Sequence, residues 1–197
     1  MNIGLYFGSF NPVHHGHLII ANFVLQRKDI DQVWMVVSPK NPFKNEKQLL
    51  NEHFRYELLK LALEGEVNIK ASKVEFNLPK PSYTAETMVY LTEKYPEHNF
   101  KIIVGGDSFQ NLEKWKNADY LKNNFSFLVY PRKDFELEKS EFNYEIIEMP
   151  LLDISSTLIR KLIREQKSVR YLLPDLVNEE ILKQLYYRDK LNNESEQ

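Results

Sequence analysis

The sequence predicts an α/β fold, a doubly wound Rossmann-like parallel sheet with helices on both faces. Short apolar runs of strand length alternate with longer segments whose apolar residues recur at helical spacing. The run Ile3 to Phe7 is followed at once by Gly8, and the run Asn99 to Val104 ends in Gly105-Gly106. In such sheets ligands bind beyond the carboxyl ends of the strands. We therefore expect the chemistry of this protein at these glycine-containing strand ends.

The remaining elements follow in a regular order. We expect strands at 3–7, 33–37, 99–104 and 125–130, with one or two short strands in 67–76. We expect helices at 16–27, around 54–62, at 84–95, from about 155 to 163, and at 178–187. Residues 1–191 are predicted to form one domain, and the polar residues 192–197 a frayed tail.

Composition excludes several classes of protein. The chain has 197 residues, of which 43% are hydrophobic and 27% charged, as in an ordinary soluble globule. Its 26 basic and 28 acidic residues argue against a nucleic-acid partner, and the lack of cysteine excludes disulfides and thiolate chemistry. No apolar run is long enough for a membrane span, and no signal-peptide pattern opens the chain. We expect a cytoplasmic protein without a membrane partner.

The loop after the first strand carries the strongest signal. It reads Gly8-Ser9-Phe10-Asn11-Pro12-Val13-His14-His15-Gly16-His17, so three of the five histidines lie within four residues. Gly8 allows a sharp turn close to a ligand, and Ser9 and Phe10 can offer backbone N–H groups beside a helix N-terminus, which favours anions. His14 and His17 are three residues apart and should project to the same side.

Two other interpretations of this loop remain open. The paired imidazoles could be metal ligands, although no third ligand stands at suitable spacing, or the loop could be a capped turn with surface histidines. Gly16 removes a side chain that would block the approach of a phosphate. We expect His15 to be structural or exposed.

A second anion site is predicted at the start of the late helix, after Ile154. Ser155 or Ser156 suits the N-cap, and Arg160 falls about one turn later, where it could bind phosphate oxygens. The alternative is an ordinary cap with an exposed arginine.

Three further segments follow strands or open helices. Lys44, in the loop after the second strand, could neutralise a phosphate or be a solvated lysine. Asp107, after Gly105-Gly106, could bind ribose hydroxyls or cap the next helix. Trp115 could stack on a flat ring or pack in the core. Thr84 and Thr87 indicate first of all helix capping.

The first loop resembles the Gly-Ser-Phe-Asn-Pro-x-His-x-Gly-His signature of the HxGH nucleotidyltransferases, which share a fold with class I aminoacyl-tRNA synthetases. The segment from Ile154 to Arg160 is similar to their second signature, Ile-Ser-x-x-x-Ile-Arg. The resemblance implies a nucleotidyltransferase-type Rossmann-like fold. It also implies that His14, His17 and Arg160 hold the phosphates of ATP.

A narrower resemblance covers nearly the whole chain. The Ser82-Tyr83-Thr84 segment, Asp107-Ser108 leading to Trp115, and the Pro-x-Lys loop ending at Lys44 are together similar to the bacterial nicotinate-nucleotide adenylyltransferases. The resemblance implies ATP and nicotinate mononucleotide as substrates, Mg²⁺ carried with ATP, and no protein metal site. It leaves a homo-oligomer open.

The resemblance also assigns roles to residues. The catalytic group is His14, His17, Lys44 and Arg160. The ATP-binding group is Gly8, Ser9, Phe10, His14, His17, Gly105, Asp107, Ile154, Ser155, Ser156 and Arg160. The pyridine-nucleotide group is Ser9, Lys44, Tyr83, Thr84, Trp115 and Arg132.

The chain departs from the family pattern at three positions. Ser9 stands for the commoner threonine, Asn11 for aspartate, and Glu86 for aspartate. The alternatives are a phosphopantetheine or glycerol-phosphate nucleotidyltransferase of the same superfamily, a non-catalytic nucleotide-sensing module, and a fragment of an aminoacyl-tRNA synthetase. The Tyr83-Thr84 segment and Trp115 argue against the first of these.

Overall fold

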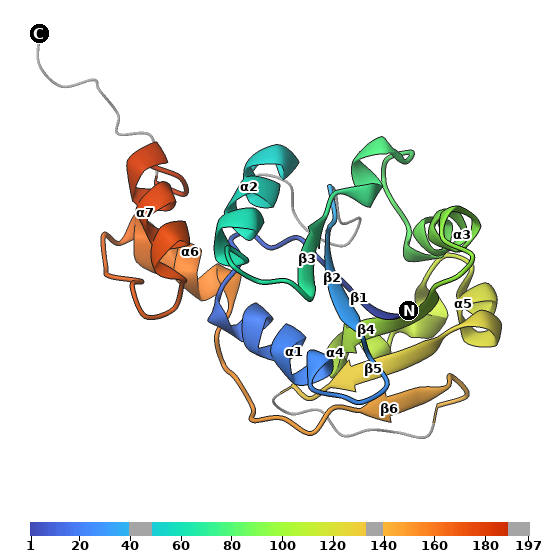
Figure 1. Cartoon of the computed structure of the whole chain (residues 1–197). Helices are drawn as coiled ribbons and strands as arrows, with labels where there is room; N and C mark the ends of the chain where they lie inside the picture. Colours follow the sequence, from blue (N-terminus) through green and yellow to red (C-terminus); the bar gives the residue numbers. More distant parts are fainter. Residues whose placement is uncertain (40–48, 133–139, 189–197) are drawn as a thin grey trace, which may run out of the picture.

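The computed structural model describes residues 1–39, 49–132 and 140–188 and contains a six-stranded parallel sheet (Figure 1). The strand order is β3-β2-β1-β4-β5-β6, and every neighbouring pair is parallel. The strands are β1 (Asn2–Gly8), β2 (Gln32–Val37), β3 (Ile69–Ser72), β4 (Asn99–Gly105), β5 (Ser126–Tyr130) and β6 (Tyr144–Ile146). This arrangement confirms the predicted fold class.

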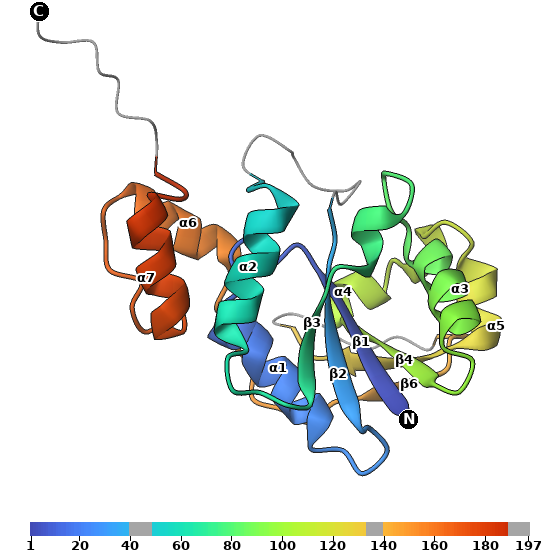
Figure 2. The same cartoon turned by 45° about the horizontal axis from the view of Figure 1, so that its top comes forward.

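Helices cover both faces of the sheet (Figure 2). The α-helices are α1 (His15–Leu25), α2 (Glu52–Ala62), α3 (Thr84–Lys94), α4 (Gly106–Phe109), α5 (Ala118–Asn124), α6 (Ser156–Arg164) and α7 (Asp175–Gln184). One core contains apolar residues of α1, α2, α6 and α7, and the other contains those of α3, α4 and α5. Of the described helices, none is long and apolar enough to cross a membrane.

The alternation of side chains along β1 explains why both faces need cover. Ile3 and Leu5 are fully buried in the core beneath α3, whereas Tyr6 points into the core shared with α1. Successive residues of a strand face opposite sides of the sheet, so a strand with apolar residues at every position needs helices on both sides.

The sheet brings four strand ends to one edge. β1 and β2 end in register at Gly8 and Val37, and β4 and β5 end in register at Gly105 and Tyr130. The chain order of the strands reverses between β1 and β4, which is where a ligand crevice forms in doubly wound sheets. The glycines singled out by the sequence therefore flank this crossover.

Some predicted elements need correction. The segment 67–76 holds one strand, β3, followed by the 3₁₀ helix η2 (Val74–Asn77), and the last helix begins earlier than expected and ends at Gln184. The strand β6 and the helix α5 were not predicted. β6 has three residues, and its edge position depends on pairing with β5 rather than on a local pattern. The predicted tail from 192 lies outside the described residues.

A buried guanidinium joins the loops at the ligand edge of the sheet. Arg55 of α2 is fully buried and donates hydrogen bonds of 2.5 to 2.9 Å to four backbone carbonyls. The acceptors are Ser9 after β1, Ser38 and Pro39 after β2, and Leu50 before α2. Burial lowers the pKa of Arg55 to about 10, so the side chain remains charged at neutral pH.

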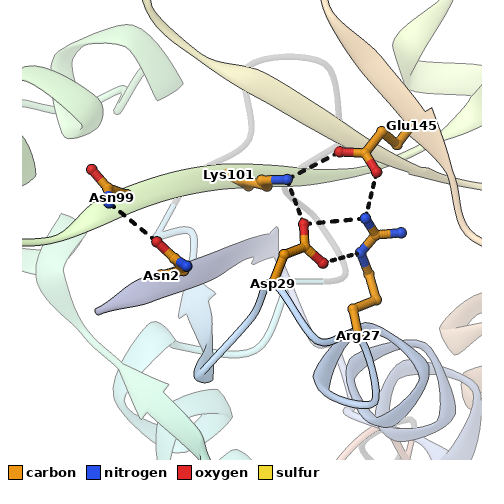
Figure 3. Close-up of polar contacts among 6 residues, drawn as sticks. All are labelled: Asn2, Arg27, Asp29, Asn99, Lys101 and Glu145. Carbon is orange, nitrogen blue, oxygen red and sulfur yellow. Dashed lines mark hydrogen bonds and ion pairs between the residues drawn. The ribbon is translucent and has the colours of Figure 1, made fainter.

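An ion-pair network joins α1 to the opposite half of the sheet (Figure 3). Arg27, two residues beyond the end of α1, binds both oxygens of Asp29 and also Glu145 of β6. Lys101 of β4 contacts Asp29 at 2.6 Å and Glu145 at 3.0 Å. Partial burial alone would raise the pKa of Asp29, but hydrogen bonds from Lys101 and Arg27 outweigh it and lower the pKa to about 2.

This network makes the stability of the fold depend on pH. The pKa of Asp29 in the folded chain lies below its ordinary value of 3.8, so its contribution is present above that value and is lost as the pH falls towards 2. The side chains of Asp29 and Glu145 are 41% and 46% exposed, so we expect Asp29→Asn to lower the free energy of unfolding by only about 1 kcal/mol at pH 6. Urea denaturation at pH 6 and pH 3 measures the difference.

The difference in free energy of unfolding between the wild type and Asp29→Asn should be smaller at pH 3 than at pH 6. The matched control is Asp153→Asn, at an exposed aspartate before α6, which should show no such pH-dependent difference. If the stability lost in Asp29→Asn is the same at both pH values, the network does not cause the pH dependence.

Candidate active site

The backbone after β1 folds sharply at Phe10. Phe10 has a φ of 42°, in the left-handed region, whereas Gly8 is the last extended residue of β1. The Phe10 ring folds back so closely that a Cβ atom on Gly8 would lie 2.8 Å from it. We expected Gly8 itself to make the turn; its lack of a side chain instead makes room for the ring of Phe10.

The two histidines assigned to catalysis lie together at the start of α1. The rings of His14 and His17 are stacked, with centroids 3.7 Å apart and an interplanar angle of 24°. The backbone N–H of His14 donates to Nδ1 of His17 at 3.3 Å. A Cβ atom on Gly16 would lie 3.0 Å from the His14 ring, so this glycine makes room for the imidazole. The expected shared side of the two residues is confirmed.

The surroundings hold His14 in its neutral form. Burial lowers the pKa of His14 to about 3, with smaller contributions from the positive charges of Arg132 and His15. Its Nδ1 is buried and has no hydrogen-bond partner among the described residues. A buried polar atom without a partner is costly unless a ligand or water completes it. His14 is thus suited to receive a polar group that is absent from the free chain.

His17 is oriented by aromatic rings. Its ring lies 5.0 Å from that of Phe10 and 6.1 Å from that of Tyr6. Because Nδ1 of His17 accepts the His14 N–H, a neutral His17 carries its proton on Nε2 and can donate from there.

The start of α6 packs directly against this loop. Ser155 is the N-cap, and its Oγ accepts the N–H of Leu158 at 3.2 Å. Ser156 donates to the carbonyl of Pro12 at 2.9 Å, and Arg160 donates to the carbonyl of Asn11 at 2.7 Å. Nε of Arg160 is buried without a partner in the described ranges. The two signature segments, about 140 residues apart, therefore form one polar site.

A cavity of about 440 Å³ lies at the crossover between β1 and β4. Tyr83, Thr84 and Trp115, which were predicted to recognise the pyridine ring, line it together with Gly8 and Gly105. Trp115 also packs against the core beneath α3, as one of its two interpretations predicted, while its place in the cavity lining keeps the other, stacking on a flat ring, a prediction. Tyr6 and Tyr130 line the cavity as well, and Tyr6 contacts His17, so aromatic rings join the cavity to the histidine loop.

A buried carboxylate in the cavity wall was not predicted. Glu75 of η2 is 2% exposed and accepts hydrogen bonds from Ser82 at 2.8 Å and Thr87 at 2.9 Å. Burial raises the pKa of Glu75, while the hydroxyls of Ser82, Thr87 and Ser38 oppose the rise. Thr84 does not cap α3, whose N-cap is Tyr83. Glu75, rather than helix capping, fixes this turn through Ser82 and Thr87.

The departure at Glu86 has a structural partner. Glu86 forms an ion pair of 2.7 Å with Lys116, whose Nζ lies 4.3 Å from the centroid of the Tyr83 ring. Lys116 lines the cavity. The longer side chain of Glu86 is accommodated because its carboxylate binds Lys116, 30 residues away in the sequence.

Asp107 and Arg132 lie beside the cavity. Asp107 lies within the first turn of α4, whose N-cap is Gly105, and its carboxylate is 3.9 Å from Nε of Arg132. Arg132 donates to the hydroxyl of Tyr130 at 3.3 Å and lies 5.2 Å from that ring. Its positive charge also lowers the pKa of His14, so Arg132 influences the histidine loop as well as contacting Tyr130 of the cavity wall.

Two further predictions concern Lys44 and a metal site. Lys44 falls outside the described residues. Within 1–39, 49–132 and 140–188, no three His, Cys, Asp or Glu side chains gather as a metal site would require. The remaining predicted residues form two adjoining groups, one at the histidine loop and one at the cavity.

Comparison with known proteins extends this picture. The cytidylyltransferase-like family model matches residues 5–162. Proteins named probable nicotinate-nucleotide adenylyltransferase from Cytophaga hutchinsonii and Flavobacterium johnsoniae are both 45% identical, each over 95% of this chain, which covers 98% and 100% of theirs.

A solved structure shares the fold. The nicotinic acid mononucleotide adenylyltransferase of Plasmodium falciparum, complexed with NaAD, superposes with a TM-score of 0.82 at 21% identity, covering 94% of this chain and 97% of that one. Together, the matching family model and the full-length relatives show that the chain belongs to the cytidylyltransferase-like family and, within it, to the nicotinate-nucleotide adenylyltransferases.

Proposed function

We propose that this chain transfers the adenylyl group of ATP to nicotinate mononucleotide, a step of NAD biosynthesis. A phosphate oxygen of the mononucleotide attacks the α-phosphorus of ATP. The new P–O bond forms as the bond to the β,γ-diphosphate breaks, giving nicotinate adenine dinucleotide and pyrophosphate. The observation that carries the proposal is the juxtaposition, at the crossover of the sheet, of the stacked His14–His17 pair and an aromatic-lined cavity.

The histidine loop suits a polyphosphate. The N-termini of α1 and α6 meet there, and each directs the positive end of a helix dipole at the site. The buried Nε of Arg160 and Nδ1 of His14 are unpartnered in the described part of the chain. The site therefore supplies polar groups that a triphosphate would satisfy.

The cavity suits the acceptor. The rings of Tyr83 and Trp115 provide flat apolar surface for a pyridine, and Lys114 and Lys116 line the same wall. Lys116 is already paired with Glu86, so it is the ammonium group of Lys114 that favours an acidic substituent over a neutral one. We propose Tyr83, Thr84 and Trp115 as the pyridine-binding residues and Lys44 as a further phosphate ligand.

The reaction needs positioning and charge stabilisation more than a base, because the attacking phosphate is already an anion. His17 would donate from Nε2 to a phosphate oxygen whose charge grows in the transition state, and Arg160 would neutralise the leaving diphosphate. ATP is expected to arrive as its Mg²⁺ complex, with the ion held mainly by phosphate oxygens. Cytoplasmic location, the single domain and a homo-oligomer stay predictions.

Steady-state pyrophosphate release with ATP tests the function. Nicotinate mononucleotide, nicotinamide mononucleotide, phosphopantetheine and glycerol 3-phosphate would serve as acceptors. We expect the highest kcat/KM with nicotinate mononucleotide. Faster turnover of either of the last two would favour the alternative reactions, and ATP binding without turnover of any acceptor would favour a nucleotide-sensing module.

The role of His17 is tested by His17→Ala. We expect kcat to fall by at least about a hundredfold, the usual worth of one preorganised donor to a developing charge. His15→Ala is the matched control, because the backbone of His15, not its side chain, makes its link to Leu172. It should retain most activity. A near-normal rate for His17→Ala would remove His17 from the mechanism.

The role of Glu75 is tested by Glu75→Ala and Glu75→Gln. Loss of hydrogen bonds from Ser82 and Thr87 should loosen the turn that carries Tyr83 and Thr84. We expect Glu75→Ala to raise KM for the mononucleotide roughly tenfold and KM for ATP less than about twofold. Glu75→Gln should be milder, because an amide can still bond both hydroxyls. An equal rise of both KM values in Glu75→Ala would contradict a role confined to the acceptor.

A further inference from the structure

The C-terminal part of the chain reaches back to the histidine loop through more than the α6 signature. Four hydrogen bonds join the two segments. Ser156 and Arg160 of α6 bind the carbonyls of Pro12 and Asn11. Beyond α6, the carbonyl of Leu172 accepts the N–H of His15 at 3.1 Å, and the hydroxyl of Tyr187 donates to Oδ1 of Asn11 at 2.9 Å. Leu172 and Tyr187 both lie beyond residues 5–162, the part of the chain that the family model matches.

Tyr187 is held where its local backbone preference would not put it. It has a φ of 65°, and Leu185, the C-cap of α7, has a φ of 55°. The left-handed region is strained for a residue other than glycine. Two such residues within three positions persist only if tertiary contacts fix the chain end. The Tyr187 hydroxyl provides such a contact.

Asn11, which accepts this hydrogen bond, also binds two other segments of the chain. Oδ1 of Asn11 also accepts the N–H of Leu50 at 3.2 Å, and the backbone carbonyl of Asn11 accepts Arg160. One residue of the histidine loop thus joins α6, the start of α2 and the chain end. A shift of Asn11 would move the loop that carries His14. It would also move the Asn11 carbonyl, which orients Arg160.

The hydroxyl of Tyr187 remains a donor across the working range of pH. Burial raises the pKa of Tyr187 above its usual range, although the nearby positive charges of Arg55 and Arg160 oppose the rise. The group therefore neither loses its proton nor supplies charge, and its contribution is geometric.

We propose that Tyr187 is a positioning residue for the adenylyl transfer, because its hydroxyl fixes Asn11 and, through it, the histidine loop and Arg160. The inference rests on the proposed function. It adds a residue 176 positions away from its partner in the sequence and outside both signature segments.

The test is Tyr187→Phe, which removes one oxygen and keeps the ring. We expect kcat to fall roughly tenfold, with KM for nicotinate mononucleotide within about twofold of the wild type, because the cavity is untouched. The melting temperature should fall by no more than about 4 °C, the equivalent of one hydrogen bond in a chain of this size. Tyr186→Phe is the matched control, with the same deletion one residue earlier, and should keep the wild-type kcat.

A double-mutant cycle with Asn11→Ala separates positioning from general stabilisation. If Tyr187 acts through Asn11, the double variant should be no slower than Asn11→Ala alone. Additive losses, or a kcat of Tyr187→Phe equal to that of Tyr186→Phe, would overturn the proposal. Wild-type protein inactive on every acceptor would instead mark failure of the proposed function, so the two failures are distinguishable.

Discussion

The ligand edge of this protein depends on the buried charge of Arg55. One guanidinium binds carbonyls of the loop after β1, the loop after β2 and the segment before α2. These carbonyls belong to segments outside the hydrogen-bond ladder of the sheet, and Arg55 gives each of them a donor. Burying a cation is costly, so the geometry must be good to repay it. Arg55 lies in α2, whose packing therefore also determines the positions of Ser9 and Ser38 at the site.

The two parts of the site are supported differently. The cavity rests on the sheet itself, on the ends of β1 and β4, with Glu75 fixing the turn of Tyr83 against it. The histidine loop rests on other loops and chain segments, through Asn11, Arg55 and Arg160. Precise placement on loops requires many mutual hydrogen bonds, because loops lack the regular ladder of a sheet. The dense network around Asn11 meets this need.

Local patterns predicted the fold and the chemistry of the histidine loop, and long-range contacts explain what they missed. The strand before Gly8, the N-cap at Ser155 and the shared side of His14 and His17 depend on spacing within a few residues. Glu75 could not be found this way, since Val74-Glu75-Phe76 alternates as a strand would and the partners of Glu75 lie on another element. Likewise, the turn at Phe10 and the contact of Tyr187 depend on tertiary packing.

The cationic side chains at the two ends of the sheet have different hydrogen-bond partners. At the end away from the cavity, Arg27 and Lys101 are matched by the carboxylates of Asp29 and Glu145, which makes a closed structural network. At the ligand edge, Lys116 and Arg132 also face carboxylates, those of Glu86 and Asp107, but the hydrogen bonds of Arg55 and Arg160 go to neutral carbonyl and hydroxyl oxygens. Such bonds orient a guanidinium without cancelling its charge. A chain of net charge -2 can therefore present a positive field to a polyphosphate at the histidine loop, because that field depends on where Arg55 and Arg160 lie rather than on the net charge.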